Sequence, residues 1–478
     1  MNTAAIDINL NVTNNTDQPQ QISVLGNPYN PLDTANARTQ YNWDITALTF
    51  TTENSVTILY RLSTEANFET FTTTLGSQNV QGVVTALNTL GIGYFYSYEL
   101  LGQTYISTYN DNYVFGELNI FTYSIIDSTF LYGTGFDAQT NTSYTLPNGK
   151  ILIGGQFSNY NGTPANRIIQ LNNDGSVNTS FIYGTGFNGD VSAIAIQNDG
   201  KILIGGAFST YDGNAVNNLI RLNADGSLDN TFSAPAPAVG DVIFQIIVLS
   251  NGQILYGYNN VTIGFLVLLN SDGSVDFSFN IGLGFDAELF GIVIQSNGKL
   301  VVVGNYTNYD GSNVNGIVRL NMDGTIDNSF IQSFPLGSQS FAIAKFTNDS
   351  LIISTFDLTN YFIILLNEDG SINNNFTTGY LDSFAKTLVI NPINSSIYCG
   401  GFFQNYSLSP SLSNPISSNR ILQLSSNGNY NSNWEINTGF NSNVNNIGLN
   451  SNNGSILVTG AFTLFQTESA NSIIRLLV

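Results

Sequence analysis

The chain has 478 residues, with 12 Lys and Arg, 33 Asp and Glu and no His, which gives a formal net charge of −21. Because the phosphate backbone of nucleic acid is bound by clustered Lys and Arg, this composition argues against a nucleic-acid partner. The lack of His excludes a Ser-His or Cys-His catalytic pair and removes the usual nitrogen ligand of zinc. The single cysteine, Cys399, permits neither an internal disulfide nor a Cys-rich metal site. We expect no metal and no cofactor.

The start of the chain, residues 1–7, has neither the basic residues nor the continuous apolar run of a secretion signal. No stretch of about 18 apolar residues occurs elsewhere. We therefore expect no contact with a membrane and synthesis in a cytoplasm, where the chain stays at least at first.

Residues 1–123 lack any repeat and are predicted to form a separate small domain, rich in β-structure and with one helix. Apolar residues alternate with polar ones from Ile6 to Val12, as in a half-buried strand. Further strands are predicted at 45–51, 55–60, 94–100 and 103–107. A helix is predicted between Ser77 and Gly91. Its apolar stripe indicates core packing more than a partner-binding face, and consists of Val80, Val83, Val84, Leu87 and Leu90.

The rest of the chain repeats a unit of about 50 residues, typified by residues 191–232. Strand A is predicted at 191–197 and is followed by the Asp199-Gly200 hairpin turn and strand B. Strand C is predicted at 218–223, and a second Asp-Gly turn leads to strand D at 227–232. The A–B hairpin pattern occurs seven times, with turns that end at Gly149, Gly200, Gly252, Gly298, Asp349, Ser395 and Gly454.

Four antiparallel strands in each of seven repeats indicate an all-β fold, a seven-bladed β-propeller spanning residues 124–478. The aromatic residue that ends each unit recurs at intervals of 46 to 58 residues, from Phe181 to Trp434. The last unit stops after strand C, while residues 124–130 carry the Asp-x-x-Phe ending of strand D. We therefore expect residues 124–130 to complete the seventh blade and close the ring.

Two segments of the unit resemble the delta-60 repeat, a propeller motif of bacterial surface proteins and some virus particles. These are the Gly-Lys-Ile-Leu-Ile-Gly-Gly-x-Phe stretch at 200–208, with Tyr211-Asp212-Gly213 after it, and the Arg-Leu-Asn-x-Asp-Gly-Ser-x-Asp-x-x-Phe segment at 221–232. The resemblance covers residues 124–478 and is specific in blades one, two and four. It implies the fold more than a function, since propellers have many unrelated roles.

The longer B–C and D–A connections are expected on one face of the propeller. Exposed Tyr beside Asn or Asp suits stacking on a sugar or contact with a protein. The alternative, which we favour, is that these aromatic rings pack between blades. The candidate binding residues are Tyr160, Tyr211 and Tyr309 in the B–C loops and Phe187 and Phe285 in the D–A loops.

The charged motifs of the repeat have structural explanations. Segments such as 223–229 resemble a calcium loop but lack its closing Glu, and Asx turns explain their residues without a metal. They also resemble the Asp-box of sialidases, but no acid and base pair can be assembled around them. Arg is predicted in five C strands, and cross-strand pairs with Asp229 and Asp327 are expected at Arg221 and Arg319. The five are Arg167, Arg221, Arg319, Arg420 and Arg475.

Residues 25–33 and 106–116 are similar to segments in structural proteins of tailed-phage particles. This resemblance implies a non-enzymatic virion protein of the head or tail, in which residues 1–123 dock on the particle and the propeller faces its neighbours or the host. Its partners would then be other virion proteins and a glycan or protein of the host surface, with several copies in one assembly. The alternative is a bacterial surface adhesin or carbohydrate-binding propeller. An enzyme would need an acidic pair on the long-loop face.

Overall fold

The computed structural model describes residues 11–13, 20–24, 40–44, 53–62, 69–74, 80–90, 94–100, 103–109, 113–123 and 126–477, without 236, 239, 332, 432, 433, 435, 437 and 451–453. The chain forms two compact units, Met1–Thr129 and Phe130–Val478. Their boundary lies six residues after the predicted one. The anchoring role predicted for the first domain stays a prediction.

The described residues of the first unit form two antiparallel sheets and one helix. Predicted strands at 55–60, 94–100 and 103–107 are confirmed as β4, β6 and β7, whereas β2, β3, β5 and β8 were not predicted. Residues 6–10 and 45–51 lie outside the described residues. One sheet has the order β1 (Asn11–Thr13), β2 (Gln20–Val24), β8 (Tyr113–Tyr123), β4 (Glu53–Leu62), β5 (Glu69–Thr74), and the other the order β3 (Gln40–Asp44), β7 (Gln103–Tyr109), β6 (Phe95–Leu100).

The helix α1 (Val80–Asn88) confirms the predicted helix and its packing. Val83, Val84 and Leu87 are buried, and the helix contacts β6 and β4. The Asn88 side chain accepts a hydrogen bond from the Phe95 amide at 2.7 Å and donates one to the Phe95 carbonyl at 3.0 Å. The apolar stripe therefore belongs to the core of this unit.

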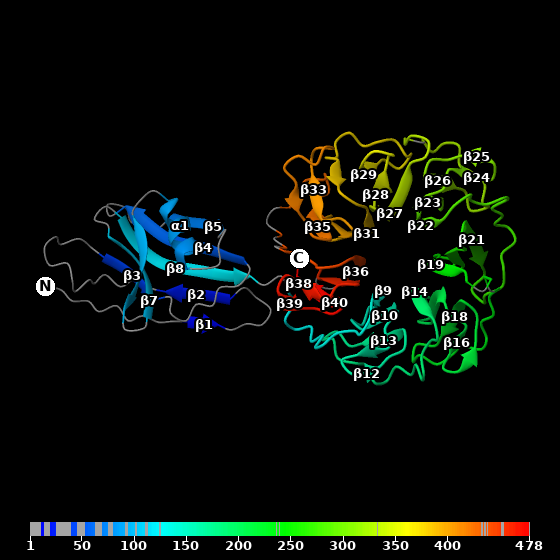
Figure 1. The fold of residues 1–478 in the computed structure, drawn as a ribbon, viewed down its shortest axis with the longest axis horizontal. Helices are drawn as coiled ribbons and strands as arrows, with labels where there is room; N and C mark the ends of the chain where they lie inside the picture. Colours follow the sequence, from blue (N-terminus) through cyan, green and yellow to red (C-terminus); the bar gives the residue numbers. More distant parts are fainter. Residues whose placement is uncertain are drawn as a thin grey trace. The chain divides into compact units, whose positions relative to one another are not determined.

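The second unit is a ring of seven three-stranded blades around a central axis (Figure 1). The first strand of each blade lines the centre, and each contacts the first strand of the next blade, with β36 against β9. These inner strands are β9 (Thr140–Thr145), β14 (Asp190–Ile196), β19 (Val242–Val248), β22 (Leu289–Ile294), β27 (Gln339–Lys345), β31 (Ala385–Ile390) and β36 (Val444–Leu449).

Each middle strand pairs antiparallel with the inner strand on one side and with the outer strand on the other. The middle strands are β10 (Ile151–Gly155), β15 (Ile202–Ala207), β20 (Ile254–Asn259), β23 (Leu300–Gly304), β28 (Leu351–Phe356), β32 (Ile397–Gly401) and β37 (Ile456–Gly460). The outer strands are β13 (Ile168–Leu171), β18 (Leu219–Leu222), β21 (Gly264–Leu269), β26 (Ile317–Leu320), β29 (Tyr361–Leu366), β35 (Ile421–Leu424) and β40 (Ile473–Leu476).

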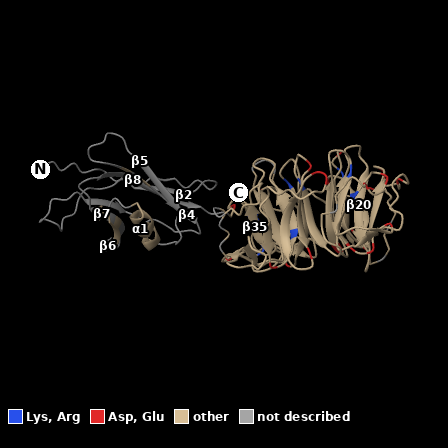
Figure 2. Cartoon of the chain, turned by 90° about the horizontal axis from the view of Figure 1, so that it is seen from above, with Lys and Arg blue, Asp and Glu red and all other residues tan. Residues whose placement is uncertain are grey.

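The middle strands are almost entirely buried, because the inner strand of the next blade packs on them. A Cβ at Gly205 would lie 2.6 Å from Cγ2 of Ile243 in the next blade, so a side chain there would clash. The first glycine of the Gly-Gly pair therefore allows close contact between blades, whereas a Cβ at Gly206 would clash with the Asp190 carbonyl oxygen of its own blade. The few charged side chains of the propeller lie mainly at the ends of strands, in turns and loops (Figure 2).

In blades one to six the predicted fourth strand is reduced to one bridging residue, as at Leu228 opposite Leu222. Asp229 ends the pairing, because its carboxylate accepts hydrogen bonds from the backbone amide and hydroxyl of Thr231 at 3.0 and 2.6 Å and turns the chain. Strand D was therefore predicted too long. Its closing aromatic residue is nonetheless buried at Phe130, Phe181, Phe279, Phe330, Phe376 and Trp434.

The seventh blade meets the first at Phe130. The guanidinium of Arg475 in β40 lies 4.9 Å from the centre of the Phe130 ring, as Arg221 lies over Phe232 and Arg319 over Phe330. The Thr140 hydroxyl of the first blade donates a 2.9 Å hydrogen bond to the Ser472 carbonyl of the last. The two ends of the propeller unit are thus in direct contact.

Five blades carry a short ribbon between their middle and outer strands, whereas blades three and five turn directly there. Strand β30 (Gly379–Leu381) pairs with both β29 and β33, which joins blades five and six in one six-stranded sheet. The ribbons are β11 (Asn159–Tyr160) with β12 (Thr163–Pro164), β16 (Thr210–Tyr211) with β17 (Asn214–Ala215), β24 (Asn308–Tyr309) with β25 (Ser312–Asn313), β33 (Asn405–Ser407) with β34 (Ile416–Ser417), and β38 (Leu464–Phe465) with β39 (Glu468–Ser469).

Candidate functional site

The five aromatic residues predicted to bind a ligand are interior residues. Each has at most 3% of its surface exposed, so the rings are not available for stacking on a sugar. The rings are packed in the interior, which is the alternative that we favoured, and are not exposed, because the loops that carry them fold onto the blades. These residues are Tyr160, Tyr211, Tyr309, Phe187 and Phe285.

Their packing repeats from blade to blade. Phe187 lies between Phe208 and Tyr211, with ring centres 4.4 and 4.6 Å away, and Phe285 lies between Tyr306 and Tyr309 at 4.6 Å from each. The Tyr211 hydroxyl donates a 2.6 Å hydrogen bond to the Gly226 carbonyl. Burial raises the pKa of this phenol. These aromatic clusters pack the long loops against the blades and form small local cores.

The Asp-Gly-Ser segments form turns. The Asp225 carboxylate accepts hydrogen bonds from the Ser227 amide at 3.0 Å and the Ser227 hydroxyl at 2.7 Å, and Asp323 does the same with Thr325. These bonds lower the pKa of Asp225. No group of three acidic, His or Cys side chains that could hold a metal occurs among the described residues.

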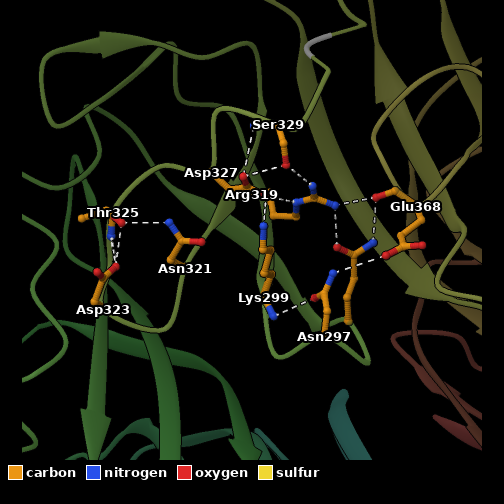
Figure 3. A network of polar contacts seen from close by, with 10 residues as sticks. Asn297, Lys299, Arg319, Asn321, Asp323, Thr325, Asp327, Ser329 and Glu368 are labelled. Carbon is orange, nitrogen blue, oxygen red and sulfur yellow. Dashed lines mark hydrogen bonds and ion pairs between the residues drawn. The ribbon is translucent and has the colours of Figure 1, made fainter.

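The predicted cross-strand ion pairs are confirmed and belong to a larger buried network (Figure 3). Arg319 donates from Nε to Asp327 at 2.6 Å, from one terminal nitrogen to the Ser329 hydroxyl at 3.0 Å and from the other to the Glu368 carbonyl at 2.6 Å. Lys299 adds a 2.6 Å ion pair to Asp327. Since Glu368 belongs to the next blade, the network ties two blades together.

Blade two repeats this network. Arg221 and Lys201 form ion pairs with Asp229, and Arg221 donates a 2.7 Å hydrogen bond to the Ser271 carbonyl of blade three. Arg167 and Arg420 differ from the prediction. They precede their outer strands in a left-handed conformation, with φ of 68° and 79°, and donate to backbone carbonyls of their own blades. They are therefore loop anchors and not members of the C strands.

The propeller contains a central cavity of about 770 Å³, lined by residues from all seven inner strands. Each inner strand pairs with its middle strand through an irregularity that leaves one residue out of register. Such bulges redirect a side chain. The seven bulged residues all line the cavity and form what we call the bulge ring: Asn141, Ser192, Phe244, Phe290, Phe341, Lys386 and Asn445.

One wall of the cavity is a chain of four stacked phenylalanines. Phe341 stacks on Phe290 with ring centres 5.7 Å apart and on Phe384 at 4.5 Å, and Phe384 stacks on Phe402 at 4.7 Å. The interplanar angles are 14°, 19° and 28°. This aromatic chain comes from blades four, five and six, and Phe244 of blade three adds a further ring.

Polar side chains from blades six, seven, one and two line another part of the cavity. Lys386 donates a 3.0 Å hydrogen bond from Nζ to the Asn445 side-chain oxygen, and the Asn445 amide donates one to the Thr140 carbonyl at 3.0 Å. The Ser143 hydroxyl donates to Asn446 at 2.7 Å. Lys386 is exposed to solvent within the cavity, and the surrounding protein lowers its pKa.

Two of the residues that line the cavity carry a charge, Lys386 and Asp190. The Asp190 carboxylate accepts a 2.5 Å hydrogen bond from Gln156 and lies 3.8 Å from Arg167 Nε. Among the described residues, no carboxylate is paired with Lys386. The cavity thus offers one cation without an acidic partner, beside an aromatic wall.

The sequence prediction missed the bulge ring, although a signal exists. The bulged residue lies eight positions before Gly149, Gly200, Gly252, Gly298 and Asp349 in the first five blades, and nine before Ser395 and Gly454 in the last two. Aligning the inner strands on their turns therefore brings the ring together. The alternation of apolar and polar residues does not reveal the ring by itself, because a bulge interrupts the two-residue period of a strand.

Three segments of the chain match a family described as a β-propeller domain of unknown function, DUF5122: residues 146–181, 197–232 and 295–330. They cover the middle and outer strands of blades one, two and four. These matches and the arrangement of the blades identify the second unit as a β-propeller. No curated protein matches the chain.

The chain is also similar to solved structures at low identity. A protein of unknown function from Bacteroides caccae is 16% identical, with 59% of this chain and 91% of that one covered and a TM-score of 0.34. Virginiamycin B lyase from Staphylococcus aureus is 16% identical, with 72% and 97% covered and a TM-score of 0.42. The extracellular domain of the putative hybrid two-component system BT3049 from B. thetaiotaomicron is 11% identical, with 80% and 45% covered and a TM-score of 0.45.

Proposed function

We propose that this chain is a non-enzymatic interaction protein whose propeller binds partners through the face on which the central cavity opens. The observation that supports this best is the bulge ring, in which seven equivalent positions around one cavity carry four kinds of residue, Phe, Lys, Asn and Ser. A ring built only for stability would need no such variety. A mixed aromatic and polar cavity is the usual form of a binding site.

Binding is favoured over catalysis by the state of the charged groups in the cavity. Hydrolysis by acid and base requires two titratable groups placed on the same bond. Asp190 is engaged by Gln156 and Arg167, and no second carboxylate lines the cavity among the described residues. The arrangement can hold a ligand but offers no matched pair for proton transfer.

The finer proposal places the protein in a tailed-phage particle, in several copies. Residues 1–123 dock on other virion proteins, and the propeller contacts neighbouring proteins or a glycan or protein of the host surface. The support is the similarity of residues 25–33 and 106–116 to phage structural proteins. The second segment lies largely in β7 and β8, and the first lies outside the described residues.

Electron microscopy of gradient-purified particles, labelled with an antibody against the propeller, tests this assignment. We expect label at a fixed place on the particle and the chain among its proteins by mass spectrometry. Particles that carry neither label nor chain would contradict the virion assignment while leaving the binding role of the cavity intact.

A second candidate function is carbohydrate binding by a surface adhesin, favoured by aromatic rings and amide side chains in one cavity. A glycan array probed with the full chain separates the two candidates in part. Binding of a neutral oligosaccharide that is lost on Phe290→Ala would support the adhesin. An array without signal would leave the structural role.

A further inference from the structure

Lys386 occupies an unusual place for a lysine. It sits at the bulge of β31, where its side chain enters the cavity and its Nζ donates to Asn445 at 3.0 Å. An ammonium has three donors, and the Lys386 side chain, which donates to Asn445, is exposed to the solvent of the cavity. The protein around it lowers its pKa by partial desolvation, and no acidic side chain is paired with it among the described residues. The site therefore favours an anion from solution.

Asn445 holds the ammonium in place. Its side-chain oxygen accepts the Lys386 hydrogen bond, while its amide nitrogen donates to the Thr140 carbonyl of the first blade. The direction of the amide is fixed by this second bond, because only a donor can face a carbonyl. Lys386 is thus positioned in advance, which reduces the entropy lost when a ligand binds.

The aromatic chain beside Lys386 favours the same kind of ligand. Phe341 has a stacked neighbour on each side, Phe290 and Phe384, and Phe384 in turn has Phe341 and Phe402. Stacking covers part of the electron-rich faces of Phe341 and Phe384, whereas ring edges carry partial positive charge. Edges are a better surface for an anion or an apolar body than for the face-stacking of a neutral sugar.

We propose that the central cavity binds a small organic carboxylate with an apolar body, whose carboxylate accepts hydrogen bonds from Lys386 Nζ and whose body lies against the Phe290, Phe341, Phe384 and Phe402 chain. The volume of about 770 Å³ lies within the range of ligand pockets, roughly 300 to 1,000 Å³. This inference rests on the proposed binding role of the cavity and adds its ligand class.

Isothermal titration calorimetry of the full chain with 3-phenylpropionate tests the proposal. We expect saturable binding at one site, and binding at least about tenfold weaker for 3-phenylpropionamide, which has the same shape without the charge. Acetate should also bind more weakly, because it lacks the apolar body. Equal affinity for the acid and the amide would overturn the role of Lys386, and tighter binding of glucuronate than of 3-phenylpropionate would overturn the apolar half of the site.

Two variants locate the site, and one serves as their control. Lys386→Met keeps the length of the side chain and should lower the affinity for 3-phenylpropionate about tenfold while leaving that for the amide unchanged. Phe341→Ala should weaken both ligands. Lys150→Met removes the same charge from an A–B turn outside the cavity and should change neither. Thermal unfolding confirms that each variant is folded.

The outcomes separate the ligand class from the binding role. If no carboxylate binds but the chain still attaches to particles or to a glycan, and Phe341→Ala weakens that attachment, the carboxylate proposal falls and the proposed function stands. If the ligand affinity and the attachment are both unaffected by Lys386→Met and Phe341→Ala, the cavity has neither role.

Discussion

The ion-pair network of blade four depends on the carboxylate of Asp327. Asp327 is buried, and its Oδ2 forms ion pairs with Lys299 Nζ and Arg319 Nε at 2.6 Å each. Through Arg319 it also orients the bond to the Glu368 carbonyl in the next blade. One side chain thus connects the end of an outer strand, the middle strand and the neighbouring blade.

Replacing Asp327 with Asn removes the charge but keeps the shape. We expect a loss of about 3 kcal/mol in the free energy of unfolding, because two cations lose their partner in a buried site. Chemical denaturation followed by tryptophan fluorescence measures it. Asp323→Asn is the matched control, since its exposed carboxylate makes only the local turn, and a loss as large as that of Asp327→Asn would contradict the network account.

The same carboxylate gives the protein a defined acid sensitivity. Burial alone would raise the pKa of Asp327, but the hydrogen bonds from Lys299, Ser329 and Arg319 outweigh burial and hold it well below its usual value. Its stabilisation is therefore fully present above the unfolded pKa of about 3.9 and is lost as the pH falls further.

We accordingly expect the stability difference between the native chain and Asp327→Asn to be constant from pH 5 to 8 and to shrink below about pH 4. Denaturation curves at a series of pH values measure this difference. A difference that grows on acidification would have the wrong sign for a depressed carboxyl pKa.

Strand β40 is the element on which closure of the ring depends. It pairs with β37, and its Arg475 lies over Phe130 and donates to the Asn173 carbonyl of the first blade. A ring without this strand would expose the edge of β37 and open the contact between the last and first blades.

Deleting residues 469–478 should therefore destabilise the whole propeller and not only its last blade. We expect a broader thermal transition that begins at lower temperature, measured by circular dichroism. Deleting only residues 477 and 478 is the control, because both lie outside β40. A 469–478 deletion that melts like the full chain would show that the contact is not needed for closure.

Periodicity was sufficient to predict most of the elements but not their surroundings. The Asp199-Gly200 turn fixes where strands A and B meet, so β14 and β15 were predicted closely. Tyr211, by contrast, lies in a B–C connection, and the sequence left open whether its ring is exposed or packed, although packing was favoured. The burial of Tyr211 depends on Phe187, 24 residues earlier, which forms an isolated antiparallel β-bridge with it and packs against its ring. Such contacts between two loops leave no local pattern in the sequence.

For the whole molecule, the sequence defined the ring but not what its centre contains. Seven equivalent strands place seven equivalent side chains around one axis, and the differences among them are what make the cavity asymmetric. Blades three to five contribute Phe to the bulge ring, and blades six, seven, one and two contribute Lys, Asn and Ser. The stability of the fold comes from what the blades share, and the proposed binding comes from what they do not.

A crystal structure of the full chain soaked in 3-phenylpropionate tests the proposed binding cavity most directly. We expect one molecule in the central cavity, with a carboxylate oxygen within about 3 Å of Lys386 Nζ and the ring against the Phe290 to Phe402 chain. An empty cavity at a saturating concentration, or a ligand bound only on the outer surface, would contradict the account.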